Sequence, residues 1–313
     1  MYEVGSNARP DWPLAVVVGA GGMGIAITRR LGQSHRLLLV SRSQATLDKQ
    51  AAALHTEGHD VITCACDVTD AQGIARVADV VANNGPMRTL AHVIGISPSM
   101  GDFRTIMAVN LVGPAMMAEA LLPFAKTGTA AIFVSSLAAY MQQEGRDSQI
   151  LDYTFYPAMR IAETNPYAVP RDVTDNAFWP LLDAPLEDGF LDSLEAKLGG
   201  ELTSHLAYRL SKAGLNRMCV RLAPIWGRQG ARIMSMSPGM IATPMGTLEY
   251  KHQPMKYEYL RRTPLSREGT MLEMADVVEF LASDRASFIT GIDLLVDGGL
   301  TTAFRQSLGG TEK

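Results

Sequence analysis

Short hydrophobic runs recur along most of the chain, and each is followed by a stretch in which apolar positions return at helical spacing. Uninterrupted apolar runs are typical of strands that are buried on both faces. We predict such strands at residues 14–18, 36–41, 61–68, 89–95, 129–136, 231–237 and 292–296. One helical pattern ends at Leu31, and others cover residues 43–58, 70–84, 103–126, 203–228 and 272–283. This alternation predicts an α/β fold, a doubly wound parallel sheet with helices on both faces.

Residues 141–202 break the rhythm, because they hold several prolines and aromatic residues and only short helical patterns. One such pattern covers 187–200, where three apolar positions share a face and two glycines end the helix. Strand–helix alternation resumes directly afterwards, so we interpret 141–202 as an insertion within a single domain of residues 13–313. Residues 1–12 are polar and lack the apolar core of a signal peptide, and we expect them to form a flexible arm.

Composition narrows the class of protein. The 313 residues are 47% hydrophobic and 19% charged, which excludes a disordered chain and allows a large core. A formal net charge of -4 gives no reason to expect nucleic-acid binding. Three cysteines cannot build a disulfide framework, and the longest weakly polar run, Leu14 to Ile27, is too short to span a bilayer. We therefore expect a cytoplasmic protein without membrane or nucleic-acid partners.

The loop after the first strand reads GAGGMG, a glycine pattern that follows a strand and opens a helix. Glycines let the backbone turn tightly and approach a pyrophosphate, which then lies at the positive end of the next helix. The pattern predicts a dinucleotide site of the Rossmann type, with a simple tight turn as the alternative. Its expected cofactor-binding residues are Gly19, Gly21, Gly22, Met23 and Gly24.

The end of the second strand predicts which nicotinamide cofactor binds. NAD sites usually place a carboxylate there for the ribose 2′-hydroxyl, whereas NADP sites place a cation. This chain has Ser41 and Arg42 at that point and no acid. We therefore favour NADP(H) over NAD(H), the alternative being a solvated arginine that opens the loop.

Tyr208 and Lys212 are four residues apart in a predicted helix and so lie on one helical face. A phenol is a poor acid or base at neutral pH. A cation about 4 Å away contributes about 4 kcal/mol at an effective dielectric of about 20, so we expect Lys212 to lower the pKa of Tyr208. The spacing alone also fits an ordinary exposed pair, and the surrounding motifs must decide.

Several motifs occur in one order along the chain, and together they resemble the short-chain dehydrogenase/reductase family. The resemblance covers residues 14–140 and 203–300. The motifs are GAGGMG, CDV at 66–68, AVN ending at Asn110, SSLAA at 135–139, YRLSK at 208–212, SPGMIATPM at 237–245 and ITGIDLLVDGG at 289–299.

The resemblance implies a role for each matching residue. Tyr208 resembles the catalytic acid/base, and Lys212 the residue that lowers its pKa and binds the nicotinamide ribose. Ser136 aligns with the serine that hydrogen-bonds the substrate oxygen, and Asn110 with the asparagine that supports a water leading to the lysine. Further cofactor contacts are implied at Asp67, Val68, Gly95, Pro238, Gly239, Ile241 and Thr243.

Two departures from the family pattern concern cofactor contacts. Val18 replaces the usual threonine before the glycine loop, and the loop is one residue shorter between its first two glycines. His92, Val93, Ile94 and Gly95 replace the usual Asn-Asn-Ala-Gly, so the side-chain hydrogen bonds of that segment are expected to be lost. Neither change touches the proton-transfer residues.

A metal is not expected in this site. Hydride transfer to a carbonyl builds negative charge on oxygen, and hydroxyl donors such as Ser136 and Tyr208 can receive it. The six histidines show no ligand spacing. We expect Cys64 and Cys66 to face opposite sides of their strand and therefore not to chelate together.

The insertion predicts where substrate specificity lies. The resemblance implies about a dozen residues between Ser136 and Tyr208, but this chain has 71. A second variable segment, 244–268, stands in place of the family's substrate loop. The insertion and the APIWG pattern are similar to those of bacterial 3α-hydroxysteroid dehydrogenase/carbonyl reductases. In this interpretation its aromatic residues line the pocket or a subunit contact, or else they form the insertion's own core: Tyr153, Phe155, Tyr156, Phe178, Trp179 and Phe190.

We expect an NADP(H)-dependent oxidoreductase that acts on a bulky hydrophobic secondary alcohol or ketone, with a steroid as one such substrate. A 3-oxoacyl thioester reductase is a second enzyme hypothesis. A sensor that binds NADP(H) without catalysis is the alternative of another class. The resemblance also implies a homo-oligomer, a dimer or tetramer built on the long helices at 103–126 and 203–228.

Overall fold

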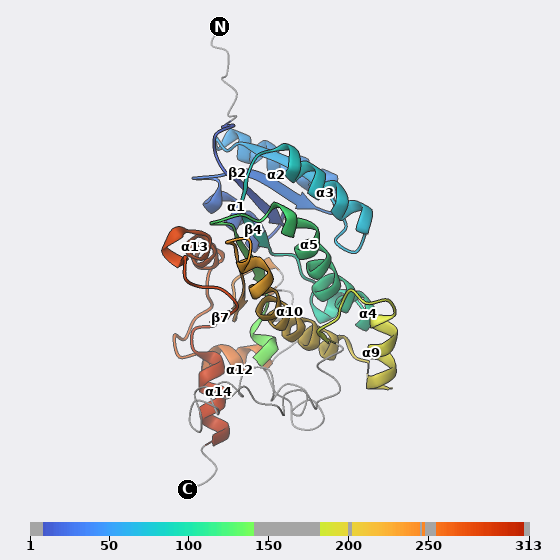
Figure 1. Cartoon of the computed structure of the whole chain (residues 1–313). Helices are drawn as coiled ribbons and strands as arrows, with labels where there is room; N and C mark the ends of the chain where they lie inside the picture. The colour runs from blue at the N-terminus through green and yellow to red at the C-terminus, as the bar shows by residue number, and fades with distance from the viewer. Residues whose placement is uncertain (1–8, 141–181, 200–201, 245, 248–254, 310–313) are drawn as a thin grey trace.

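The computed structural model describes residues 9–140, 182–199, 202–244, 246–247 and 255–309. These residues form a seven-stranded parallel sheet in the order β3-β2-β1-β4-β5-β6-β7 (Figure 1). The strands are β1 (Leu14–Val18), β2 (Arg36–Ser41), β3 (Val61–Ala65), β4 (Met87–His92), β5 (Ala130–Val134), β6 (Arg232–Pro238) and β7 (Asp293–Val296). The predicted doubly wound sheet is confirmed.

Helices cover both faces of the sheet, as the uninterrupted apolar strands require. Strand β1 shows why: Leu14, Val16 and Val18 face one layer, Ala15 and Val17 face the other, and all are fully buried. One layer consists of α3 (Ala71–Asn83), α5 (Gly113–Leu121) and α10 (Ser204–Gly227). The opposite layer consists of α1 (Met23–Leu31), α2 (Gln44–Thr56) and α13 (Met271–Ala282).

The order of the strands creates a crevice beside β1. The chain builds β1, β2 and β3 outward in one direction and then returns to place β4 on the other side of β1. The loops that follow β1 and β4 therefore diverge at the carboxyl edge of the sheet. Ligands of open α/β sheets bind at such a switch point, so the two loops mark the first place to seek a site.

The predicted helix at 103–126 is one continuous helical stretch with a change of winding inside it. It runs through α4 (Phe103–Met107), a π-helical turn η2 (Ala108–Val112), α5 and a 3₁₀ turn η3 (Leu122–Phe124). Among the described residues, this stretch is the one long and apolar enough to cross a membrane, and 56% of its most apolar window is buried inside the fold. The π-turn carries Asn110, and such turns often occur at functional sites.

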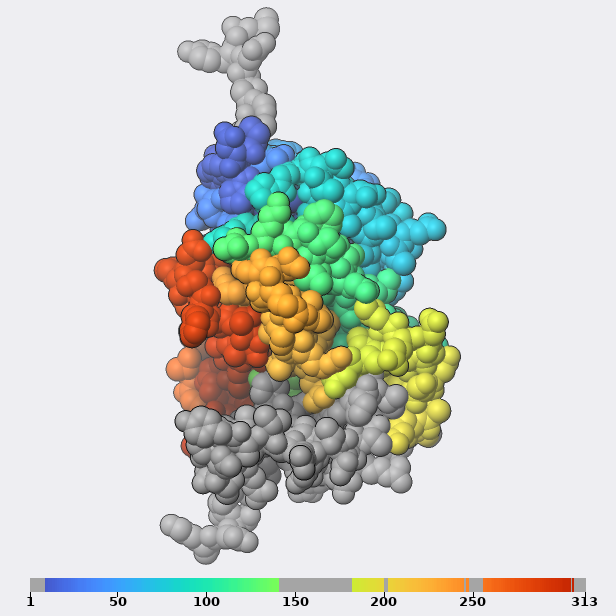
Figure 2. All heavy atoms as spheres, in the orientation of Figure 1, coloured from blue at the N-terminus to red at the C-terminus, as the bar shows by residue number. Residues whose placement is uncertain are grey.

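Part of the predicted insertion packs on the sheet domain. Helix α9 (Phe190–Leu198) buries Phe190 and Leu194 in an apolar cluster with residues of α4 and α10. On the outer side of α9, Asp192 and Glu195 form ion pairs with Arg104. Figures 1 and 2 show this yellow segment lying on the surface beside α4. Residues 141–181, including most of the aromatic residues named above, lie outside the described residues.

The prediction for Cys64 and Cys66 was wrong. Both thiols belong to the same helical layer, because side chains two apart along an extended strand share a face. Burial raises the pKa of both thiols, to about 11 for Cys66. Within the described residues, no group of three or more potential metal ligands is present.

Candidate active site

The loop between β1 and α1 holds a conformation that only glycines allow. Gly19 and Gly22 have φ angles of 129° and 49°, in the region that favours glycine. A Cβ atom on Gly24 would lie 1.9 Å from the carbonyl oxygen of Gly19, closer than any non-bonded contact allows. Cβ atoms on Gly21 and Gly22 would meet nothing within 4 Å. The loop therefore closes tightly on one side and leaves open space on the other.

Helix α1 directs its N-terminus at this open space. Gly22 is the N-cap residue and supplies no side-chain cap, and the first turn contains no acidic residue. The backbone N–H groups of the first turn and the positive end of the helix dipole are therefore available to an anion. Together with the open side of the loop, this geometry fits a pyrophosphate group.

The end of β2 presents a cation next to a carboxylate. The Arg42 side chain is 81% exposed, and its guanidinium lies 4.0 Å from the carboxylate of Asp67 after β3. Asp67 accepts hydrogen bonds from the backbone N–H and the hydroxyl of Thr69, which hold the pKa of its carboxyl below the usual value. Ser41 is the last residue of β2, and Val68 is buried beside Gly113 of α5. The structure thus brings together the residues predicted at the adenosine end.

Tyr208 and Ser136 meet at the carboxyl edge of the sheet. Ser136 follows β5, and its hydroxyl forms a hydrogen bond with the phenol of Tyr208 from α10. The Ser136 Oγ also accepts a hydrogen bond from the backbone N–H of Ala138 at 3.2 Å, which fixes its orientation. Two hydroxyl groups from different elements therefore point to one place, where they can donate to the same oxygen atom.

Lys212 lies one helical turn after Tyr208 and is almost completely buried. Its Nζ donates a hydrogen bond to the carbonyl oxygen of Val134 at 3.1 Å and lies 5.8 Å from the centre of the Tyr208 ring. Burial lowers the pKa of Lys212 to about 8. The net pKa shift of the Tyr208 phenol is opposite to the predicted one. Burial raises the pKa of Tyr208, and the opposing effect comes from Ser136.

Asn110 holds the loop after β4 beside the lysine. Its side-chain amide donates to the carbonyl oxygen of Ile96 at 3.0 Å, and its Oδ1 accepts from the Ile96 N–H at 2.8 Å. A Cβ atom on Gly95 would lie 3.0 Å from the Lys212 Nζ and 3.5 Å from the Asn110 Oδ1. Gly95 thus lets the loop approach Lys212 and Asn110, two of the four predicted catalytic residues.

The segment after β6 closes the other side of the edge. Pro238 ends β6, and the N–H of Gly239 donates to the carbonyl oxygen of Val296. A Cβ atom on Gly239 would lie 2.5 Å from the Cα of Asp297, so the two backbones touch. Ile241 forms a β-bridge with Gly269, and the Thr243 Oγ1 accepts a hydrogen bond from the N–H of Gly246. These contacts set the segment's path past the carboxyl end of β6.

Residues 13–148 match the family model described as short chain dehydrogenase, and residues 190–301 match the model described as Enoyl-(Acyl carrier protein) reductase. The chain is 30% identical over 287 residues to the short-chain dehydrogenase/reductase bsc3 of Alternaria brassicicola. That similarity covers 91% of this chain and 94% of the relative. The chain belongs to the short-chain dehydrogenase/reductase family. Members of this family are NAD(P)-binding oxidoreductases.

Two further similarities place this short-chain dehydrogenase/reductase among its relatives. It is 27% identical over 270 residues to a 3-alpha-hydroxysteroid dehydrogenase/carbonyl reductase of Comamonas testosteroni, covering 81% of this chain and 91% of that one. It shares the fold of an actinorhodin polyketide ketoreductase crystallised with NADPH, with a TM-score of 0.68 and 19% identity over 94% of this chain and 99% of that one. The suspected family is confirmed.

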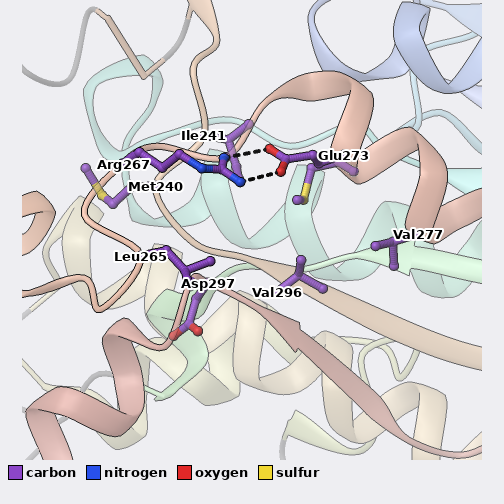
Figure 3. A pocket seen from close by; sticks show the side chains of 11 residues that line it. Met240, Ile241, Leu265, Arg267, Glu273, Val277, Val296 and Asp297 are labelled. Atoms are coloured by element: carbon purple, nitrogen blue, oxygen red, sulfur yellow. Dashed lines mark hydrogen bonds and ion pairs between the residues drawn. The ribbon is translucent and has the colours of Figure 1, made fainter.

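Sequence reasoning missed two features of this site. One is a pocket lined by Ile241 and by an ion pair between Arg267 and Glu273 (Figure 3). The other is His92, which stands where the family pattern has an asparagine and is buried at the end of β4. A histidine that directly follows the buried residues Leu90 and Ala91 of β4 is the available signal for His92.

Proposed function

We propose that this short-chain dehydrogenase/reductase transfers a hydride between NADP(H) and a bulky, hydrophobic secondary alcohol or ketone. The observation that supports it most is the convergence of Tyr208, Ser136, Lys212 and Asn110 beside the glycine loop. The open side of that loop, the uncapped N-terminus of α1 and the buried ammonium fit a dinucleotide that carries phosphates and a ribose. When bound, the nicotinamide supplies or accepts the hydride.

The protein's own groups handle the proton and the developing charge. Because burial raises the pKa of Tyr208, the phenol carries a proton at neutral pH and can donate it to a carbonyl oxygen. Ser136, which contacts the same phenol, donates a second hydrogen bond to that oxygen. The Lys212 ammonium stabilises the phenolate that remains after transfer. In the reverse direction the phenolate removes the alcohol proton, so oxidation is favoured at higher pH.

Arg42 provides the test of cofactor preference. We expect Arg42→Ala to lower kcat/KM with NADPH by about tenfold or more, because a charge-assisted contact to the 2′-phosphate is lost. With NADH, kcat/KM should stay within about threefold, since no such phosphate is present. Steady-state kinetics with both cofactors measure the ratio. Arg228→Ala, at an exposed arginine on the far end of α10, serves as the control. If Arg42→Ala leaves the ratio of kcat/KM with NADPH to kcat/KM with NADH unchanged, Arg42 does not contact the 2′-phosphate.

The substrate side is built partly by the insertion. The apolar cluster of α9, which contains Phe190 and Leu194, packs against Tyr208 itself. Helix α9, which lies within 141–202, therefore belongs to the apolar cluster against which Tyr208 packs. Leu137, the residue after Ser136, belongs to a second apolar cluster with Met240, Leu300 and Tyr259 of α12 (Met255–Arg262). One apolar cluster thus adjoins Tyr208 and another begins next to Ser136, which favours a large hydrophobic substrate.

A substrate panel tests this proposal. Steroids, cyclic ketones and aromatic ketones are compared with a small 3-oxoacyl thioester, and NADPH oxidation is followed at 340 nm. Turnover of bulky ketones supports the proposal, whereas turnover of the thioester alone overturns it. The thioester hypothesis is kept because residues 190–301 match an Enoyl-(Acyl carrier protein) reductase model. Cofactor binding without turnover of any substrate would favour a non-catalytic sensor.

The remaining proposals concern the protein's surroundings. We propose a cytoplasmic homo-oligomer, a dimer or tetramer, that acts on small molecules and binds neither nucleic acid nor membrane. The boundaries of a single domain at 13–313, with 141–202 as insertion and 244–268 as substrate loop, belong to the same proposal. Sedimentation analysis of the purified protein measures the oligomeric state directly.

A further inference from the structure

His92 ends the central strand β4 directly below the candidate active site. Its side chain is 1% exposed, and its ring stacks on Phe133 of the neighbouring strand β5 with centroids 5.4 Å apart and an interplanar angle of 19°. The backbone after His92 leads through Gly95, where Lys212 and Asn110 meet. The imidazole thus lies in the buried layer directly beneath the loop that carries Gly95.

The imidazole is held neutral and has an unused acceptor. Burial and the nearby charge of Lys212 lower the pKa of His92 to about 3, so the ring does not titrate at working pH. Nε2 is buried and has no hydrogen-bond partner among the described residues. A neutral imidazole carries one proton, and with Nε2 as the open acceptor that proton belongs on Nδ1. Nε2 is left as a lone pair in an apolar surrounding.

The Lys212 ammonium has N–H donors that no described residue accepts. Its ammonium carries three N–H groups, and among the described residues it donates one hydrogen bond, to the Val134 carbonyl oxygen. Val134 follows Phe133, the residue on which His92 stacks. His92 pairs with Phe133 in the β4–β5 register, so the carbonyl oxygen that Lys212 contacts belongs to the residue next to the partner of His92. Buried polar atoms in proteins are almost always satisfied, commonly by a water that joins two or more polar groups.

We propose that His92 is a positioning residue that, together with Lys212, holds a buried water and so keeps the ammonium oriented and charged beside Tyr208. This inference rests on the proposed function. The water accepts a hydrogen bond from the Lys212 ammonium and donates one to the His92 Nε2, and no proton is transferred between the three groups. The role is specific to this chain's histidine, since it needs a neutral ring with a bare acceptor.

Other groups around His92 do not supply this effect. From α10, Lys212 is the charged group that acts on the imidazole, and Tyr208 is a neutral phenol at neutral pH. From η2, Asn110 uses both ends of its amide on Ile96. From β5, Phe133 contributes only its ring face. Any change in the charge of Lys212 on altering His92 therefore comes through the histidine itself.

Two variants test the proposal in the cofactor-bound enzyme. His92→Phe keeps a ring to stack on Phe133 and removes the acceptor, whereas His92→Asn keeps an acceptor. Without the acceptor the charged form of Lys212 is less favoured, and the phenolate of Tyr208 loses support. We expect the pH profile of kcat/KM for alcohol oxidation to move to higher pH by about half to one pH unit in His92→Phe. In His92→Asn, which keeps an acceptor, most of that shift should be absent and the profile should lie close to that of the wild type.

A second measurement does not depend on turnover. In the wild-type holoenzyme, ¹⁵N NMR of the His92 ring should show a proton on Nδ1 and an Nε2 that accepts a hydrogen bond. A high-resolution crystal structure should show a water between Nε2 and the Lys212 ammonium. The proposal would be overturned if no water contacted the Nε2 of His92, or if the pH profile of kcat/KM for His92→Phe matched that of the wild type. If wild type turns over no alcohol or ketone, the proposed function fails, and the NMR and crystal results still decide the role of His92.

Discussion

Replacing Tyr208 by phenylalanine is expected to lower kcat/KM for ketone reduction by about 10³-fold, because the proton donor is lost and the oxygen keeps only Ser136. Affinity for NADPH should stay within about threefold, since the ring and its packing against the α9 cluster remain. Stopped-flow or steady-state kinetics give the first quantity, and fluorescence titration of bound NADPH gives the second.

Ser136→Ala is the matched variant for this experiment. It removes the second donor but leaves the phenol, so we expect a smaller loss of about 10²-fold in kcat/KM. Thermal melts of both variants should stay close to the wild type, because both residues are only partly buried and each substitution removes a single oxygen atom. Retention of full activity in Tyr208→Phe would exclude the assigned proton donor. A collapse of both stability and NADPH binding would instead indicate a structural role.

Some parts of the site could be predicted because they depend on local sequence. The glycine loop needs particular residues at particular positions, and Gly24 shows the reason in its contact with Gly19. The apolar run of β1 needs two buried faces, and both are present. Tyr208 and Lys212 share a helical face through their spacing alone. In each case the determining interaction lies within a few residues or within one element.

Other parts could not be predicted because they depend on contacts between distant segments. The pKa of Tyr208 depends on how deeply the folded chain buries the phenol, which the helical spacing of Tyr208 and Lys212 does not reveal. The predicted strand 89–95 ends at His92, where the chain turns off to reach Asn110 and Lys212. From the sequence, His92 is only a departure from the family's asparagine. Its stacking on Phe133 of β5 and its closeness to Lys212 of α10 depend on the folded structure.

The glycine loop offers the second large effect. A Cβ atom on Gly24 would lie 1.9 Å from the Gly19 carbonyl oxygen, so Gly24→Ala must push the backbone of the loop apart. The same stretch holds hydrogen bonds from the Gly24 N–H to Gly21 and from the Thr28 hydroxyl to the Gly24 carbonyl oxygen. We expect the melting temperature of the apoprotein to fall by about 5 °C or more, and NADPH affinity to fall at least about tenfold.

Gly21→Ala separates folding from cofactor binding in the same loop. A Cβ atom there meets nothing within 4 Å, and the residue does not have a positive φ, so the melting temperature should change by no more than about 1 °C. The added methyl group nevertheless points into the open space assigned to the pyrophosphate, and NADPH affinity should still fall about tenfold. Calorimetry and NADPH titration measure the two quantities on one sample. If Gly21→Ala binds NADPH as tightly as the wild type, the pyrophosphate does not lie over this loop, and the open side of the glycine turn has another purpose.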